Sequence, residues 1–307
     1  MYQSIRPFQT ALIPLRTLHY HVRHWGTPSH TEAPLVLLHG WMDVGASYQF
    51  VVDAFSEAFV QGRHILAPDW RGFGLTQPPA GNDHYQFADY LADLDRLLDH
   101  YAPDQAVDLV GHSMGGNIAM MYAGVRPQRI RRLINLEGFG MPANTPEQAP
   151  TRYAQWLDEL QRCEQGTLGL KTYDSASAVA RRLIKTNPRL PQDKADWLAQ
   201  HWAQPDSQGQ WHILADAAHK IVNAQLYRVE ETLALWRAIT APTLAVEASD
   251  DSLSQWWQGR YTLAQYHERL QAVHDCQIAI VQDAGHMLHH DQPHAVAALI
   301  ESFLART

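Results

Sequence analysis

Residues 110–116 read VGHSMGG, and this stretch decides the fold. An apolar run, AVDLV at 106–110, precedes it, and NIAMMYA at 117–123, with apolar residues at helical spacing, follows it. A strand, a sharp turn that carries serine and then a helix form a nucleophile elbow, with glycine where backbone segments approach too closely for a Cβ. The pattern predicts that Ser113 lies on a strained turn with helix amides pointing toward it. The plain alternative is a glycine-rich connection between a strand and a helix.

The composition limits the class of protein. The chain has 307 residues, 46% of them apolar, which is enough for one large α/β domain with an inserted subdomain. The formal net charge of −8, with no basic block, argues against nucleic acid and an anionic membrane surface as partners. The two cysteines, Cys163 and Cys276, form no disulfide framework, so we expect a reducing, cytoplasmic location. No apolar run resembles a signal peptide or reaches the roughly 20 residues of a membrane span.

Short apolar runs alternate with helical patterns along most of the chain. Such runs are typical of strands buried on both faces, so the alternation predicts a doubly wound, mostly parallel sheet with right-handed crossovers. An edge strand is expected over 15–25, and the clearest helices are expected over 87–101 and 293–304. Further helices are expected near 46–59 and over 255–272. The expected buried strands lie at 35–38, 64–68, 106–110, 132–136, 243–246 and 277–281.

The alternation stops between residues 141 and 240. This part is rich in large aromatics and has helical patterns but no buried-strand runs. We therefore expect an α/β core domain at 1–140 and 241–307, with a helical cap at 141–240. Most of the aromatics are expected to form the core of the cap, and a few to line a pocket. The helices expected here lie at 153–163, 177–184, 192–201, 214–225 and 230–237.

Four motifs in this order give the chain a family resemblance: HGW at 39–41, DWRGFG at 69–74, GHSMGG at 111–116 and AGH at 284–286. The chain resembles the α/β-hydrolase fold superfamily, of the lid-bearing esterase, C–C hydrolase and dehalogenase type. More weakly, LEGFG at 136–140 and the segment 286–293 resemble the bacterial serine hydrolase-like branch. The resemblance implies a sheet of about eight strands with a helical cap over the site.

Ser113 and His286 are the predicted nucleophile and general base. A serine hydroxyl is a poor nucleophile near neutral pH and needs a base within hydrogen-bond reach. His286 directly follows the last predicted strand. The nearby residues His289, His290, His294 and Asp291 suggest a metal cluster, but the resemblance assigns them to a loop and the closing helix. We therefore expect no metal and no cofactor.

The oxyanion hole is expected to consist of two backbone amides. One belongs to Met114, the residue after the nucleophile, and the resemblance points to Trp41 for the other. Neither role depends on the side chain, and the indole of Trp41 is expected to form a pocket wall.

Two carboxylates are candidates for the acid that orients His286. The chain order of this fold, Ser, then Asp or Glu, then His, is satisfied by both Asp251 and Glu137. Asp251 follows the strand at 243–246, where the resemblance places the acid, although Ala248 stands in place of the usual glycine. Glu137 ends the strand after the elbow helix, where some dehalogenase-like relatives place theirs. Asp251 is preferred, and Asp250 ranks third.

These residues predict a serine hydrolase that cleaves a carboxylic ester or related acyl bond of a small, largely apolar substrate. Hydrolysis of a carbon–carbon bond in a dienoate-like ketone and perhydrolysis remain alternatives, because the same triad serves them. Relatives that hydrolyse epoxides or remove halogens use a carboxylate nucleophile, where this chain has Ser113. An alternative of another class is a non-catalytic ligand-binding protein on a hydrolase scaffold. The pattern determines neither the substrate nor the oligomeric state.

Overall fold

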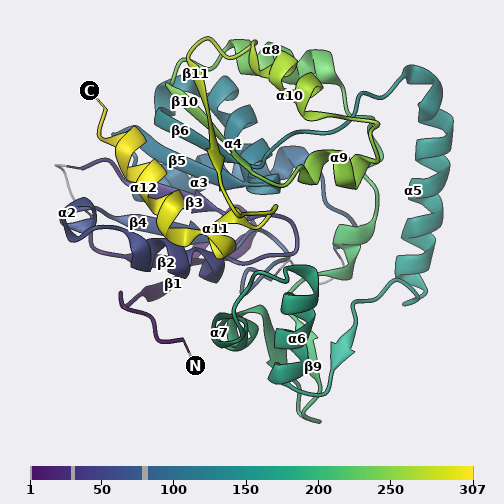
Figure 1. The fold of residues 1–307 in the computed structure, drawn as a ribbon. Helices are drawn as coiled ribbons and strands as arrows, with labels where there is room; N and C mark the ends of the chain where they lie inside the picture. The colour runs from purple at the N-terminus through teal and green to yellow at the C-terminus, as the bar shows by residue number, and fades with distance from the viewer. Residues whose placement is uncertain (1, 29–31, 78–81, 307) are drawn as a thin grey trace.

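A computed structural model describes residues 2–28, 32–77 and 82–306. Its centre is an eight-stranded sheet in the order β1-β2-β4-β3-β5-β6-β10-β11, with helices on both faces (Figure 1). The six strands from β4 to β11 run parallel, so the predicted mostly parallel, doubly wound sheet is confirmed. The parallel strands are β4 (Ile65–Pro68), β3 (Leu35–Leu38), β5 (Val107–His112), β6 (Ile130–Leu136), β10 (Thr243–Ala248) and β11 (Cys276–Val281).

The N-terminal edge of the sheet is a hairpin where we expected one strand over 15–25. β1 (Gln9–Leu15) pairs antiparallel with β2 (Leu18–Trp25), which in turn pairs antiparallel with β4. The turn at Arg16 has a positive φ of 54°. Pro14 obscures the strand pattern, yet a residue without an amide hydrogen is tolerated in an edge strand.

Two apolar layers enclose the sheet. Val36 and Leu38 of β3 face one layer, and Leu35 and Leu37 face the other, as expected for a strand buried on both faces. The first layer contains residues from α3 (Phe87–Tyr101), α4 (Met114–Val125), α8 (Val229–Arg237), α9 (Ser252–Trp257) and α10 (Leu263–Leu270). The second contains residues from α1 (Gln49–Ala54), α11 (Leu288–Asp291) and α12 (Pro293–Leu304).

Two expected helices are interrupted. The segment near 46–59 forms η1 (Gly45–Tyr48), α1 and α2 (Glu57–Val60), because the backbone is extended at Phe55 and Ser56. The segment 255–272 divides into α9 and α10. The first helix ends at Gln258, which is left-handed, and Thr262 starts the second with a capping box.

The insertion contains helices and a small three-stranded sheet. The described helices are η3 (Pro146–Gln148), α5 (Ala149–Glu164), α6 (Ala176–Thr186), α7 (Gln192–Trp202), η4 (Ala217–Lys220) and α8 (Val229–Arg237). The sheet, in the order β7-β9-β8, consists of Thr172–Tyr173, Trp211–Ile213 and Ala203–Pro205. The predicted helix over 214–225 is wrong, since only the short η4, capped by Asp216, forms there. Strands of two or three residues are too short to show a periodic pattern.

The parts of the insertion pack differently. Val179 of α6 and Leu198 of α7 share an apolar cluster with Val44 and Phe50, which follow β3. By contrast, α5 has no buried residue and stands apart at the right of Figure 1. α8 packs against α4, where a Cβ on Gly124 would lie 2.1 Å from the carbonyl oxygen of Leu235. The division into a core and a cap at 141–240 stays a prediction.

Within the described ranges, no helix is both long enough and apolar enough to cross a membrane.

The turn from β5 to α4 is built by very close backbone contacts. A Cβ on Gly111 would lie 2.3 Å from the Gly115 carbonyl oxygen, and a Cβ on Gly115 would lie 2.3 Å from that of Leu38. Ser113 lies between Gly111 and Gly115 in the chain. Its backbone has φ 52° and ψ −114°, a conformation that residues other than glycine rarely adopt. The predicted strained turn carrying Ser113 is therefore present, held against the end of β3.

Replacing Gly111 by alanine is expected to lower the free energy of unfolding by about 3 kcal/mol or more, because two backbone segments would have to separate. Gly169→Ala is the matched control, since a Cβ there meets no described atom within 4 Å. Chemical denaturation measures both variants. Equal stability of the two would contradict the packing described for the turn.

Candidate active site

The predicted site residues follow the carboxyl ends of neighbouring parallel strands. Ser113 follows β5, Glu137 follows β6, Asp251 follows β10 and His286 follows β11. These ends lie at one edge of the sheet, where ligands bind in open α/β folds. The amide of Ser113 donates to the carbonyl oxygen of Leu136 at 2.8 Å, so the serine turn lies directly beside the residue that precedes Glu137.

The imidazole of His286 is paired with Glu137. Its Nδ1 lies 3.2 Å from Oε2 of the carboxylate, which is 3% exposed. The amide of Ala248 donates to Oε1 at 2.7 Å, and the hydroxyl of Ser252 donates to Oε2. Three donors from three segments therefore surround this carboxylate, as a buried charge requires. Glu137 itself has a positive φ of 56°, which turns the chain sharply after β6.

Asp251 has a different role. Its side chain caps α9 by accepting from the amide of Ser254 at 2.9 Å. Asp250 forms an ion pair with Arg189 at 2.7 Å. The structure thus places Glu137 beside His286, and it places the preferred candidate, Asp251, at the N-terminus of α9. Of the two candidate acids, Glu137 rather than the preferred Asp251 is therefore the one within hydrogen-bond reach of the imidazole. The longer side chain of Glu137 reaches the imidazole from the end of β6, and a helix begins immediately after Asp251.

The loop that carries His286 is held on both sides. Oδ2 of Asp291 accepts from the amide of Gly285 at 2.9 Å. Nε2 of His112, the residue before the serine, lies 2.7 Å from the carbonyl oxygen of His286. Burial lowers the pKa of His112 well below its usual range, so its ring is neutral and must carry hydrogen on Nε2 to make this bond. The serine turn and the histidine loop are therefore joined directly.

The environment also shifts the pKa of His286 itself. Burial lowers the pKa below the ordinary value of about 6.5. The hydrogen bond and negative charge of Glu137 act in the opposite direction and offset part of this effect. The imidazole is consequently neutral near pH 7, as a group that accepts a proton must be.

The residues predicted for the oxyanion hole flank the serine turn. Met114 is the first residue of α4 and follows Ser113. On the other side, a Cβ on Gly40 would lie 3.2 Å from Cβ of Ser113, so the chain leading to Trp41 passes close by. Nδ1 of His39 bonds the Gly40 carbonyl oxygen at 2.8 Å, and its Nε2 accepts from the amide of Trp70 at 2.8 Å. The loop before Trp41 is thus fixed from within the core.

Sequence reasoning missed two contributors. The ring of Trp256 lies against His286 with centroids 3.9 Å apart, although its side chain is 53% exposed. Ser252 supports the carboxylate, as described above. Both belong to α9, the helix that begins directly after Asp251, and this position in the chain was their sequence signal. Trp41, directly after the glycine that lies against Ser113, is similarly exposed, at 52%.

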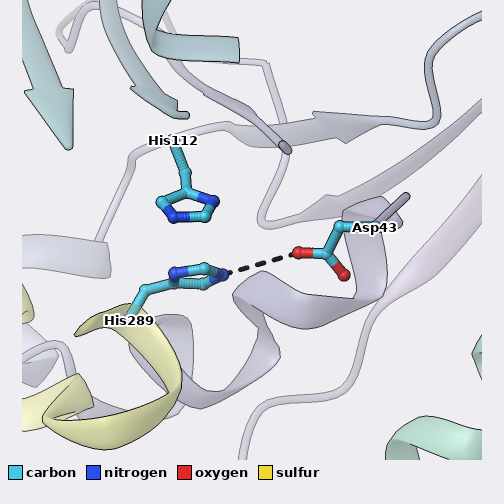
Figure 2. A group of neighbouring side chains, drawn as sticks. All are labelled: Asp43, His112 and His289. Atoms are coloured by element: carbon cyan, nitrogen blue, oxygen red, sulfur yellow. Dashed lines mark ion pairs between the residues drawn. The ribbon is translucent and has the colours of Figure 1, made fainter. Parts of the chain in front are cut away.

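The histidines after His286 do not converge as a local cluster. His290 packs against Phe50, with ring centroids 5.7 Å apart, and His294 is exposed at the start of α12. His289 instead turns toward Asp43 and His112, which come from the loop after β3 and the end of β5 (Figure 2). Asp291 accepts a hydrogen bond from the backbone amide of Gly285.

Comparison with known proteins identifies the family. The model of the alpha/beta hydrolase fold matches residues 33–293, so the chain belongs to this family and is a hydrolase of the α/β fold. A serine hydrolase-like protein of Danio rerio is 25% identical over 287 residues, covering 91% of this chain and 83% of that protein. A 2-hydroxy-6-oxo-2,4-heptadienoate hydrolase of Pseudomonas putida is 37% identical over 111 residues, 35% of this chain and 38% of that protein. The solved thioesterase domain from the curacin biosynthetic pathway is 26% identical, with a TM-score of 0.79 over 96% of this chain and 99% of that domain.

The pKa of His286 is expected to lie below about 6.5, and Glu137→Gln is expected to lower it further, because the carboxylate stabilises the imidazolium. Asp251→Asn is the control and should leave the value unchanged, since that carboxylate serves α9. An NMR pH titration measures the pKa, with the signal assigned by its loss in His286→Gln. A value that moves with Asp251→Asn but not with Glu137→Gln would contradict the pairing.

Proposed function

We propose that this member of the alpha/beta hydrolase fold family is a serine hydrolase that cleaves a carboxylic ester or related acyl bond of a small, largely apolar substrate. The observation that carries the proposal is the hydrogen bond between His286 and buried Glu137, beside the strained turn of Ser113. A neutral imidazole oriented by a carboxylate is what activates a serine hydroxyl.

In the proposed reaction, Oγ of Ser113 attacks the substrate carbonyl carbon while Nε2 of His286 accepts the hydroxyl proton. Glu137 holds the hydrogen on Nδ1 and stabilises the imidazolium. Collapse of the tetrahedral intermediate expels the alcohol, which takes the proton from Nε2, and leaves an acyl-serine. Water then attacks the acyl carbon with His286 again as base, which releases the carboxylic acid and restores Ser113.

Two backbone amides are proposed to stabilise the oxyanion, those of Met114 and Trp41. The first lies at the N-terminus of α4, where the helix dipole favours negative charge. The second belongs to the loop that His39 and Gly40 hold against the serine turn. Because the donors are backbone groups, their positions depend on the fold of these two segments rather than on side chains.

The proposed preference for an apolar substrate rests on the exposed indoles of Trp41 and Trp256. Trp256 lies against His286, and we propose that it contacts the substrate beside the base. The similarity to a thioesterase domain supports a thioester as a related acyl substrate. Hydrolysis of a carbon–carbon bond is a second candidate, favoured by the similarity of part of the chain to the heptadienoate hydrolase.

The proposal predicts that a fluorophosphonate probe labels Ser113 covalently in the folded protein, because the activated hydroxyl attacks phosphorus. Intact-protein mass spectrometry measures the added mass, with Ser113→Ala as the unlabelled control. A panel of nitrophenyl esters, an acyl thioester and a dienoate ring-fission ketone then separates the candidates. A folded protein that is never labelled and turns over none of these compounds is a binding protein, and the proposal is then wrong.

Glu137→Gln is expected to lower kcat about 10⁴-fold, the loss seen when a triad acid becomes an amide. Asp251→Asn is the matched control, because asparagine caps a helix about as well as aspartate, and both kcat and stability should stay near the wild-type values. Steady-state kinetics on the best ester of the panel measures both variants. If Asp251→Asn caused the larger loss in a folded protein, the acid would be misassigned.

A further inference from the structure

A buried polar cluster lies beside the predicted triad and has no role in the proposed reaction. It consists of Asp43 from the loop after β3, His112 at the end of β5 and His289 in α11 (Figure 2). The three residues are 4%, 2% and 0% exposed. One oxygen or nitrogen of each lies within 4.8 Å of the corresponding atoms of the other two.

The atoms that face one another in this cluster are not used elsewhere. Ser47 donates to Oδ1 of Asp43, but no described residue gives a hydrogen-bond partner to Oδ2. The same holds, within the described part of the chain, for Nδ1 of His112 and for both ring nitrogens of His289. Nε2 of His289 and Oδ2 of Asp43 form an ion pair at 3.6 Å, a separation too long for a hydrogen bond. Leaving buried polar atoms unpaired is unfavourable by some kcal/mol, and such groups are rare in folded proteins.

The hydrogen bonds around the cluster suit a metal ligand. Nε2 of His112 carries its hydrogen toward the carbonyl oxygen of His286, so Nδ1 presents a lone pair. A histidine that binds a metal through one nitrogen almost always donates from the other to a carbonyl or carboxylate. Figure 2 shows the ring of His112 above that of His289, with the carboxylate of Asp43 at the edge of the His289 ring.

We propose that Asp43, His112 and His289 bind a divalent transition-metal ion, with Zn²⁺ as the probe. Two imidazoles and one carboxylate form a donor set that binds such ions in preference to Mg²⁺ or Ca²⁺. Ligands of a tetrahedral zinc ion at its usual bond lengths lie roughly 3.3 to 3.5 Å apart. Oδ2 of Asp43 and Nε2 of His289 are 3.6 Å apart, so this pair needs almost no adjustment.

The position of the site gives it a structural role. The ion would join the loop after β3, the end of β5 and α11. Through the bond from His112 to His286, it would also stabilise the loop of the predicted base. Since all three residues are buried, the ion enters only when these segments open, and loading is expected to be slow.

The experiment measures metal content and thermal stability of the full chain, without a substrate. Protein freed of metal by a chelator is incubated for hours with Zn²⁺, desalted and analysed by mass spectrometry of the metal. The wild type is expected to retain about one Zn²⁺ per chain and to unfold at a higher temperature when loaded. Asp43→Asn and His289→Gln are each expected to lose this ion, with the dissociation constant raised at least about 100-fold.

Controls separate this site from zinc bound at the surface. His294→Gln removes an exposed histidine near the cluster and should retain the ion. Any zinc held at exposed pairs such as His212 and Asp206 would be the same in every variant, so its contribution cancels. Equal zinc content in the wild type and the folded cluster variants would overturn the proposal and leave the contact between His289 and Asp43 as a structural pair without a metal.

A measurement on the wild type covers the case in which the cluster variants fail to fold. Crystals grown with Zn²⁺ are expected to show an anomalous-scattering peak among Asp43, His112 and His289. Peaks only at surface histidines, or density for a water molecule at this position, would overturn the proposal. Neither readout depends on whether Ser113 is a nucleophile, so this proposal and the proposed function can fail separately.

Discussion

The close contact between the turn after β5 and the ends of its neighbouring strands is the constraint on which the candidate site depends. Gly115 lies against the backbone of Leu38, Gly40 lies against Ser113, and the amide of Ser113 bonds the carbonyl oxygen of Leu136. These contacts fix the loop after β3, the serine and the start of Glu137 relative to one another through backbone atoms. The strained φ of Ser113 persists because so many contacts determine it. Side-chain chemistry is then added to a frame that is already rigid.

Helix α9 shows how Glu137 and Asp251, two carboxylates that both satisfy the expected chain order, acquire different roles. Asp251 caps the helix, and this fixes the first turn so that Ser252 donates to Glu137. One turn later Trp256 lies against His286. Asp251 therefore supports the pair of Glu137 and His286 through the helix that it starts, while remaining outside that pair. The environment distinguishes the two carboxylates, because Glu137 is buried and accepts three hydrogen bonds.

The sequence predicted those features that depend on local pattern or on short motifs. The bounds of β3, α3 and α12 agree with the predictions, since a continuous apolar run marks a strand buried on both faces and apolar residues at helical spacing mark a helix. The helix expected over 214–225 failed, and the small sheet of the insertion was missed, because two- or three-residue strands are stabilised by tertiary contacts. The sequence pattern favours Asp251, whereas the structure places Glu137 beside His286 and Asp251 at the start of α9, and the reason is related. Spacing along the chain does not show which carboxylate a helix N-terminus will use.

The histidines after His286 show the same limit at the level of single side chains. His289 and His290 are adjacent in sequence, but successive residues of a helix point about 100° apart, so one turns toward Asp43 and the other toward Phe50. The polar cluster that forms takes its other members from the loop after β3, which carries Asp43, and from the end of β5, which carries His112. Only the convergence of parallel strand ends at one edge of the sheet brings them together. The same convergence that builds the candidate triad therefore also buries a second polar group beside it, and burial makes the pairing of that group a requirement of the fold.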